Sequence, residues 1–225
     1  MLEIKRLTKG FTQGERLIEV LKGVDFSLEK GEVVAILGQS GSGKSTLLSL
    51  LAGIEAPDSG EMKLEGQSLS ALTEDELTVL RGQKIGIIFQ QFHLLPHLTA
   101  LENVSLPLEI HGKLNAFEVK QAAQKALDDV GLGHRLDHFP NQLSGGEKQR
   151  VAIARSMVVG PDLLLADEPS GSLDEGTGEK VMDIIFNLVK EKKKAMILVT
   201  HNKELAARCE KTFVLEGGFL KEEQL

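Results

Sequence analysis

The chain has 225 residues, of which 41% are hydrophobic and 26% charged, and its net charge at pH 7 is −7. This balance is typical of one large globular domain or two small lobes, and the acidic charge disfavours a nucleic-acid partner. Tryptophan and tyrosine are absent, which removes two common platforms for stacking on bases. The sequence has no apolar run long enough to cross a membrane and its start lacks the apolar core of a signal peptide, so we expect a cytoplasmic protein.

The N-terminal third begins with strand patterns. The first thirty residues read as short strands with turns at Gly10, Gly14 and Gly23, which predicts a small antiparallel layer. Residues 32–37 form an apolar run rich in β-branched residues, which is typical of a buried parallel strand. Residues 46–52 have the pattern of a helix start. These elements place a turn of eight residues between a strand and a helix.

That turn, residues 38–45, reads Gly-Gln-Ser-Gly-Ser-Gly-Lys-Ser and matches the phosphate-binding pattern G-x-x-x-x-G-K-[ST]. Its glycines let backbone N–H groups converge on an anion, and the following helix N-terminus adds partial positive charge. We expect Lys44 to reach the β- and γ-phosphates of a nucleotide, and the Ser45 hydroxyl to ligate Mg²⁺. A plain glycine-rich turn with a solvated lysine is the alternative, which the strand–loop–helix context disfavours. The residues expected to contact the nucleotide here are Gly38, Gln39, Ser40, Gly41, Ser42, Gly43, Lys44, Ser45 and Thr46.

The rest of the chain alternates between strand and helix patterns. Strand-like runs occur at 85–89, 163–166, 195–200 and 212–215, and helical patterns at 73–81, 116–130, 145–159, 176–190 and 203–209. This alternation predicts an α/β fold with a parallel sheet. Residues 92–160 carry no strand pattern, which predicts a helical insertion. We therefore expect one nucleotide-binding domain, with a core of residues 1–91 and 161–225 and a helical subdomain of residues 92–160.

Within that insertion, residues 143–147 read Leu-Ser-Gly-Gly-Glu. Ser144 and Glu147 have the S-x-x-E spacing of a capping box for the helix that follows. Two glycines in a first helical turn cost about 1 kcal/mol each relative to alanine. A plain cap has no use for Gly145 and Gly146, whereas an anion approaching the backbone does. The chain therefore has two glycine-rich helix N-termini suited to phosphate.

A second strand, residues 163–166, runs into Asp167, Glu168 and Pro169. A carboxylate beside a buried strand is costly unless it is paired or near a metal, and successive strand residues point to opposite faces. We therefore expect Asp167 to hold Mg²⁺ through water. Glu168 is expected to orient and deprotonate an attacking water molecule. Two solvated acids at a strand end are the alternative, which the phosphate-binding loop disfavours.

Together these motifs resemble the ATP-binding subunits of ATP-binding cassette (ABC) transporters, over essentially the whole chain. Residues 143–147 are similar to the signature motif of that family. By this resemblance Gln90 is the glutamine of the Q-loop, residues 170–174 are the D-loop with Asp174 at the nucleotide, and His201 is the switch histidine that contacts the γ-phosphate. Phe11 stands where the family usually has a tyrosine that stacks on adenine; a phenylalanine of the core is the alternative.

The resemblance implies a RecA-like P-loop nucleoside triphosphatase core with a parallel sheet, an N-terminal antiparallel β layer and an inserted helical subdomain. It implies ATP hydrolysis with Mg²⁺ by a homodimer that forms on ATP binding. Each ATP would lie between residues 38–46 of one copy and Ser144, Gly145 and Gly146 of the other. The implied catalytic residues are Lys44, Gln90, Glu168 and His201, and the implied metal ligands are Ser45, Gln90 and Asp167. The implied partner is a transmembrane permease, which would hold the chain at the inner face of the membrane.

One subgroup resembles this chain more than others. Residues 89–96 and 98–104 are similar to the lipoprotein-release and macrolide-export type (LolD, MacB and YbbA-like proteins), and residues 132–138 and 205–209 look closest to YbbA-like members. The subgroup implies a permease with few helices and a large extracytoplasmic domain, whose substrates move on the periplasmic side. The chain departs from the usual sequence of this subgroup at two places. The D-loop reads Ser-Gly-Ser-Leu-Asp instead of Thr-Gly-Asn-Leu-Asp, and Lys148 replaces a common glutamine.

Several other classes of protein share part of this pattern. ABC proteins of translation usually carry two cassettes, and those of chromosome repair separate the phosphate-binding loop from the signature by hundreds of residues, unlike Lys44 and Ser144 here. A generic P-loop kinase has no use for residues 144–147. An importer-type cassette, and an FtsE-like regulatory cassette with slow turnover, remain alternatives because intact Glu168 and His201 are compatible with both.

Overall fold

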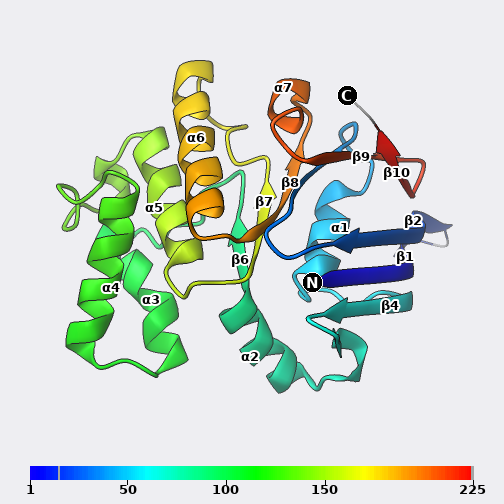
Figure 1. Cartoon of the computed structure of the whole chain (residues 1–225), viewed down its shortest axis with the longest axis horizontal. Coiled ribbons are helices and arrows are strands. Elements are labelled where there is room, and N and C mark those ends of the chain that lie inside the picture. The colour runs from blue at the N-terminus through cyan, green and yellow to red at the C-terminus, as the bar shows by residue number, and fades with distance from the viewer. Residues whose placement is uncertain (15, 224–225) are drawn as a thin grey trace. The chain divides into compact units, whose positions relative to one another are not determined.

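The structure is a computed structural model and describes residues 1–14 and 16–223. The chain forms two compact units, Met1–Arg81 with Lys194–Leu225, and Gly82–Lys193 (Figure 1). The elements of the first unit are β1 (Leu2–Gln13), β2 (Arg16–Leu28), β3 (Val33–Leu37), α1 (Lys44–Leu51), β4 (Ser59–Leu64), β5 (Gln67–Ser68), η1 (Leu69–Ala71), most of α2 (Glu74–Lys84), β8 (Ala195–Thr200), α7 (Lys203–Ala206), β9 (Lys211–Glu216) and β10 (Phe219–Glu223). Those of the second unit are β6 (Ile85–Ile88), α3 (Ala100–His111), α4 (Ala116–Asp129), η2 (Pro140–Gln142), α5 (Gly145–Met157), β7 (Leu163–Asp167) and α6 (Glu175–Glu191).

The first unit contains strands of two sheets. An antiparallel sheet has the order β2-β1-β4-β5, and a second set of strands has the order β10-β9-β3-β8. Strand β3 pairs in parallel with both β8 and β9. Its residues Val34, Ala35 and Ile36 are fully buried, because both faces of a parallel sheet are covered. The predicted strand at 32–37, the parallel sheet and the N-terminal antiparallel layer are therefore confirmed.

The two sheets of the first unit contact each other. The ring of Phe26 in β2 meets that of Phe213 in β9 edge to face, with 5.1 Å between the ring centroids. The backbone N–H of Lys22 donates to the carbonyl of Gly218, in the turn after β9, at 2.8 Å. An aromatic pair of this kind adds about 0.5–1.5 kcal/mol beyond its buried area. These contacts fix the antiparallel layer beside β9, which is the neighbour of β3.

Two of the predicted N-terminal turns are wrong. Gly10 lies inside β1 and Gly23 inside β2, whereas Gly14 does lie in the turn between the two strands. Gly23 has a φ of 103° and is the extra residue of a bulge, since Leu7 pairs with Val24 and the next pair is Thr8 with Lys22. A bulge leaves one residue unpaired and increases the local twist. These glycines therefore bend two long strands instead of ending several short ones.

The second unit is mainly helical. Strands β6 and β7 pair in parallel, and α5 is deeply enclosed, with Val151, Ala152, Ile153, Ala154 and Met157 all buried. No strand occurs between residues 92 and 160, all of which the structure describes, as predicted. The limits proposed for a helical subdomain at 92–160 stay a prediction.

Helix α3 was not predicted as a separate helix. It contains Pro107, which interrupts the pattern of a helix in the sequence. A start signal was nevertheless present, because Thr99 and Glu102 form a complete capping box before the helix. The buried amide of Asn103 then binds the preceding segment: it accepts from the N–H of Leu95 and donates to the carbonyls of Leu95, Leu98 and Thr99.

The ends of two other helices differ from prediction. Helix α7 stops at Ala206 instead of residue 209, and α2 continues to Lys84 instead of ending near residue 81.

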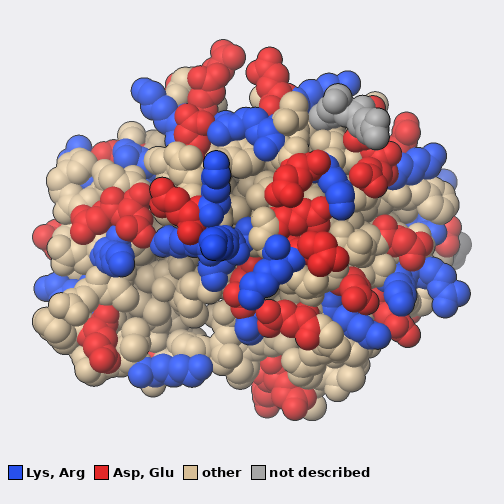
Figure 2. Space-filling model, viewed as in Figure 1, with Lys and Arg blue, Asp and Glu red and all other residues tan. Residues whose placement is uncertain are grey.

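Among the described residues, no helix has the length and apolarity that a membrane span requires. Acidic and basic side chains are interspersed over the face drawn in Figure 2, as expected for a chain with 26 basic and 33 acidic residues.

Candidate nucleotide site

The predicted phosphate-binding loop lies between β3 and α1, as the sequence pattern requires. Gly43 begins α1 with a φ of 99°, a conformation that glycine adopts readily. A Cβ at this position would lie only 2.6 Å from Cγ1 of Val20. Strand β2 therefore packs directly against the end of the loop, and both the backbone conformation and the available space require glycine.

The N-terminus of α1 is open to an anion. No side chain caps it, and its first turn contains no acidic residue. A helix leaves its first backbone N–H groups unpaired and carries roughly half a positive charge at that end. The start of α1 therefore combines backbone donors that no side chain caps with a partial positive charge that no acid of its own first turn offsets.

Two polar side chains of the loop have spare hydrogen-bonding capacity. Lys44 is buried, and its Nζ donates to the carbonyl oxygens of Gly38 at 2.8 Å and Gln39 at 2.9 Å, which uses two of its three donors. The Oγ of Ser42 is buried and has no hydrogen-bond partner within the described part of the chain. An unpaired buried hydroxyl costs about 1–3 kcal/mol. The loop therefore fits a ligand that accepts hydrogen bonds, such as a phosphate.

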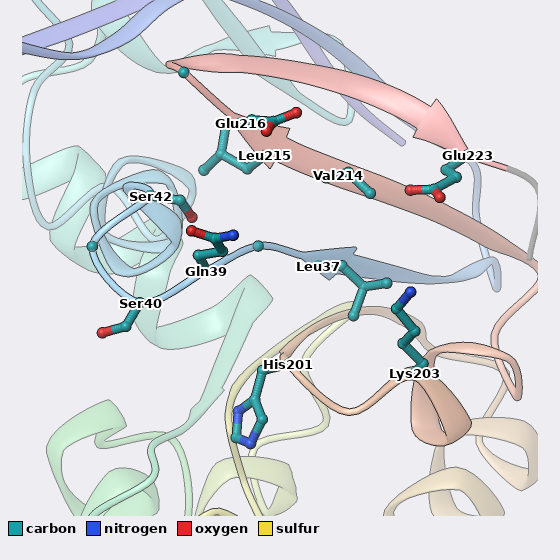
Figure 3. Close-up of a pocket in the computed structure, with 13 residues that line it drawn as sticks. Leu37, Gln39, Ser40, Ser42, His201, Lys203, Val214, Leu215, Glu216 and Glu223 are labelled. Atoms are coloured by element: carbon teal, nitrogen blue, oxygen red, sulfur yellow. The ribbon is translucent and has the colours of Figure 1, made fainter.

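The loop opens onto a pocket of about 550 Å³ within the first unit (Figure 3), a size typical of small-molecule sites. Residues Gly38, Gln39, Ser40, Gly41 and Ser42 line one part of it. His201, which follows β8, lines the same pocket. The backbone after His201 is fixed because Asn202 caps α7 by accepting the N–H groups of Glu204 and Leu205. His201 and the loop therefore line one pocket, and contact of His201 with a γ-phosphate stays a prediction.

Sequence reasoning missed the rest of the pocket wall. This part consists of Leu37, Lys203, Val214, Leu215, Glu216, Gly217 and Glu223. Most of these residues belong to β9, β10 or the turn between them, and β9 pairs with β3. Parallel strands end at the same edge of a sheet, where ligands of α/β proteins commonly bind. These residues could be predicted only from the strand order, which the sequence alone does not reveal.

Phe11 lies near the end of β1 and is 41% exposed, so the alternative of a phenylalanine in the core is wrong. The Nζ of Lys9 lies 5.4 Å from the centroid of its ring, within the range of a cation–π contact. Its cross-strand partner is Ile18, also exposed. Stacking of Phe11 on adenine stays a prediction.

In the second unit, Asp167 is the last residue of β7 and Glu168 follows it. Glu168 has a φ of 43°, which is uncommon for a residue other than glycine. The turn is closed by the N–H of Gly171, which donates to the carbonyl of Glu168 at 2.9 Å. A strained backbone of this kind costs about 1–3 kcal/mol and is concentrated at functional sites. This backbone conformation therefore gives the Glu168 carboxylate a different direction from the one that a continued β7 strand would give it.

Gln90 lies against the predicted D-loop, residues 170–174. The Ser172 hydroxyl donates to the carbonyl of Gln90 at 3.0 Å, and a Cβ on Gly171 would lie 2.9 Å from the Gln90 amide nitrogen. Asp174 caps α6 by accepting the N–H of Thr177, and its hydrogen bonds with Thr177 lower the pKa of its carboxyl. The second unit thus brings Gln90 together with the residues after β7.

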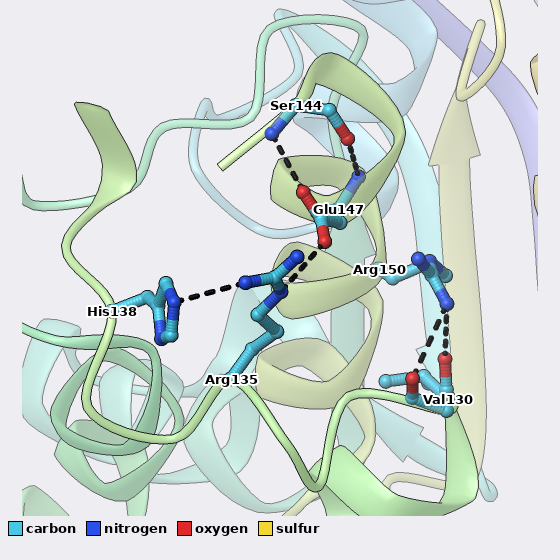
Figure 4. Close-up of polar contacts among 7 residues, drawn as sticks. Val130, Arg135, His138, Ser144, Glu147 and Arg150 are labelled. Carbon is cyan, nitrogen blue, oxygen red and sulfur yellow. Dashed lines mark hydrogen bonds and ion pairs between the residues drawn. The ribbon is translucent and has the colours of Figure 1, made fainter. Parts of the chain in front are cut away.

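The predicted capping box at the start of α5 is present (Figure 4). The N–H of Ser144 donates to Oε2 of Glu147 at 2.8 Å, and the N–H of Glu147 donates to Oγ of Ser144 at 3.3 Å. The other carboxylate oxygen accepts from Nε of Arg135 at 3.0 Å. The backbone hydrogen bond from Ser144 lowers the pKa of Glu147. Its negative charge is therefore held within the first turn of α5.

The two glycines of this motif have a use within the chain. A Cβ on Gly146 would overlap Cγ2 of Thr177 in α6, and one on Gly145 would lie 3.2 Å from Cδ2 of Leu173. The sequence-based expectation that only an approaching anion needs these glycines is therefore wrong for Gly146. Close packing of α5 against α6 requires a small residue there, whether or not an anion binds.

Comparisons with known proteins agree with this arrangement. A model of the ABC transporter family matches residues 21–171. YbbA of Escherichia coli K12, described as an uncharacterized ABC transporter ATP-binding protein, is 47% identical, covering 99% of this chain and 97% of its own. The lipoprotein-releasing system ATP-binding protein LolD of Idiomarina loihiensis is 46% identical over 100% of this chain and 98% of its own.

Solved structures give the same result. An ATP-binding cassette solved as a dimer in a post-hydrolysis state, bound to ADP and Pi, is 42% identical and has a TM-score of 0.92, covering 100% of this chain and 99% of that chain. The α/β architecture with its parallel and antiparallel sheets is thus that of such cassettes. On the family match and these relatives together, the chain belongs to the ABC transporter family, among its ATP-binding subunits of the ABC ATPase class.

Proposed function

We propose that this chain hydrolyses ATP with Mg²⁺ between two of its copies and thereby drives a separate permease of the LolD and MacB type. The observation that carries the proposal is the loop before α1: the helix has no side-chain cap, and residues 38–42 of the loop line one pocket together with His201. A helix start without a side-chain cap, the buried Ser42 hydroxyl and the Lys44 ammonium, which lies against the carbonyls of Gly38 and Gln39, suit a polyphosphate.

In the first unit, the backbone N–H groups of residues 38–46 bind the phosphates. The Lys44 ammonium stabilises the β- and γ-phosphates with its remaining donor, and the His201 ring contacts the γ-phosphate. Mg²⁺, which prefers one or two protein oxygens together with phosphate oxygens, would be held by the Ser45 hydroxyl and would neutralise charge on the phosphates; the Asp167 carboxylate, in the second unit, is the other proposed ligand.

In the second unit, Glu168 orients the attacking water molecule and accepts its proton. The Gln90 side chain would supply an amide oxygen to the metal. The bond between the γ-phosphorus and its bridging oxygen breaks as the water oxygen bonds to phosphorus, leaving ADP and inorganic phosphate. Most of the acceleration comes from positioning and from stabilisation of charge.

The second copy completes the site. We propose that each ATP lies between residues 38–46 of one copy and Ser144, Gly145, Gly146 and Asp174 of the other. The solved relative in a dimeric post-hydrolysis state supports this assembly. That relative is dimeric with both ADP and Pi bound, so the copies here would separate once the cleaved phosphate leaves and removes the charge that joins the two faces.

The proposed partner is a permease with a large extracytoplasmic domain, which holds the cassettes at the inner face of the membrane. LolD is named as part of a lipoprotein-releasing system, and the permease here would act on substrates of a similar amphiphilic or periplasmic kind. The test is copurification of the chain from membranes with the product of the neighbouring permease reading frame, together with ATPase activity of the complex. A chain that hydrolyses ATP but never associates with a membrane protein would favour the alternative of a regulatory cassette.

A further inference from the structure

We propose that Gln149 and Arg155 of α5 are positioning residues: they hold Gln90 and Glu168 in register with the start of α5. This inference rests on the proposed function, because it concerns the residues proposed there to act on ATP. All of the contacts involved lie within the second unit. Neither residue is part of the site predicted from the sequence.

Gln149 bridges two segments of backbone from inside the protein. Its side chain is 0% exposed, and its Nε2 donates to the carbonyl of Phe89 at 3.2 Å and to that of Pro169 at 2.6 Å. Phe89 directly precedes Gln90, and Pro169 directly follows Glu168. One amide group therefore ties together the chain neighbours of both residues.

Arg155 binds the other end of the same segment. Its Nη1 donates to the carbonyl of His93 at 2.6 Å and its Nη2 to that of Phe92 at 2.9 Å. The rings of Phe89 and His93 also meet, with 5.0 Å between their centroids. A planar guanidinium has fixed donor directions, which an ammonium lacks. The segment 89–93 is therefore attached to α5 at both ends, with Gln90 between the attachments.

The energetics of Gln149 favour positioning over simple packing. Its Oε1 is buried and has no hydrogen-bond partner among the described residues. A buried acceptor left unpaired is destabilising, and an apolar side chain of similar volume avoids that penalty. A methionine would fill the same space without an unpaired oxygen. What a methionine cannot do is donate to the carbonyls of Phe89 and Pro169.

These contacts connect the start of α5, which is proposed to bind ATP, with Gln90 and Glu168, which are proposed to act in its hydrolysis. Helix α5 begins at the capping box of Ser144, which is proposed to meet the ATP of the other copy. The ring of Phe92 lies about 4 Å from the position of a Cβ on Gly145. A helix moves largely as one body, so a shift at its start carries Gln149 with it. Engagement of ATP by α5 is thereby passed to Gln90 and Glu168 of the same chain.

The test compares Gln149→Met with Gln124→Met, the same substitution at an exposed position of α4. In the full-length chain we expect Gln149→Met to lower kcat for ATP at least about tenfold, because small misplacements of catalytic groups have effects of this size. We expect KM and the Kd for ATP to stay close to those of Gln124→Met, and Tm to fall modestly, because removal of the unpaired Oε1 offsets only part of the cost of leaving two carbonyls without their donor. Arg155→Lys should lower kcat less, since an ammonium still reaches one carbonyl.

A spectroscopic readout separates positioning from a structural role. The sequence has no tryptophan, so Phe92→Trp introduces a single fluorophore into the Q-loop, and every comparison is made in that background. We expect ATP with Mg²⁺ to change its emission, and Gln149→Met to abolish most of that change while ATP still binds.

Three results would overturn the inference. They are a kcat for Gln149→Met equal to that of Gln124→Met, a loss of kcat that the fraction of unfolded protein explains, and an unaltered tryptophan response. An unmodified chain without ATPase activity would count against the proposed function instead, and the tryptophan response to ATP would still decide the role of Gln149.

Discussion

The two glycine-rich helix N-termini of this chain have opposite electrostatic settings. Helix α1 starts at Gly43 with no side-chain cap and no acid in its first turn. Helix α5 starts with a complete capping box, in which the carboxylate of Glu147 already accepts from Ser144 and Arg135. Negative charge at a helix start offsets its positive potential. The first N-terminus is therefore suited to bind phosphate alone, and the second to bind it only with help from another surface.

The largest effect on kcat is expected from Glu168, the proposed base for the ATP that both helix starts bind. Glu168→Gln should lower kcat by about 10²–10⁴-fold, the usual contribution of a general base. The variant should still bind ATP and therefore accumulate as a dimer held at both helix starts. Light scattering with and without ATP measures this. A single mass under both conditions would contradict the proposed assembly, and normal turnover would contradict the role of Glu168.

The comparison also predicts that one copy binds ATP mainly through α1. Lys44→Ala should weaken ATP binding about 10- to 100-fold, since a hydrogen bond to a charged group contributes about 1.5–3 kcal/mol. Ser144→Ala should leave the affinity of the isolated copy unchanged. Titration calorimetry on Glu168→Gln, kept dilute enough to remain monomeric, measures both. Equal losses in the two variants would remove the proposed difference between the helix starts.

A third prediction separates packing from ligand binding at Gly146. Gly146→Ala should destabilise the chain by about 1–3 kcal/mol, because the new methyl group overlaps Thr177. Thr177→Ser removes the opposing Cγ2 and should restore most of this stability, as measured by chemical denaturation. If ATPase activity returns with stability, the glycine serves packing only. If activity stays low in the stable double variant, the backbone at Gly146 also meets the nucleotide.

The smallest expected effect concerns the charge on Glu147. Its pKa is lowered by the hydrogen bond from the Ser144 backbone and by Arg135, so the ionised form stabilises the folded chain. This contribution is present at neutral pH and begins to disappear below the ordinary glutamate pKa of about 4.3. Glu147→Gln should cost less than about 1 kcal/mol at pH 7. The difference from the unmodified chain should vanish in denaturation curves recorded at lower pH; a constant difference would rule out the charge as its source.

The sequence was most informative where a local pattern determines local structure. The strand before Gly38, the loop and α1 follow from apolar residues, glycines and a lysine at fixed spacing, and the capping box of α5 from Ser144 and Glu147. Helix α3 was missed because Pro107 obscured its pattern. The long strands β1 and β2 were read as shorter ones because a bulge glycine such as Gly23 resembles a turn residue in sequence.

Features that depend on distant contacts were not predictable. The wall of the pocket formed by β9 and β10 requires the strand order, and the packing of Gly146 requires knowledge that Thr177 faces it. Gln149 gave no signal either, because a single glutamine in a helix is normally exposed. Its burial and its two carbonyl partners are tertiary facts.

The left-handed backbone at Glu168 has a consequence for attempts to make this protein more robust. A non-glycine side chain in that conformation is energetically unfavourable, so Glu168, the proposed base, lowers the stability of the folded chain. Glycine at this position would relax the backbone while removing the acid. A screen for heat resistance alone should therefore enrich Glu168→Gly variants, which we expect to lack ATPase activity. Such a screen must also select for ATP hydrolysis.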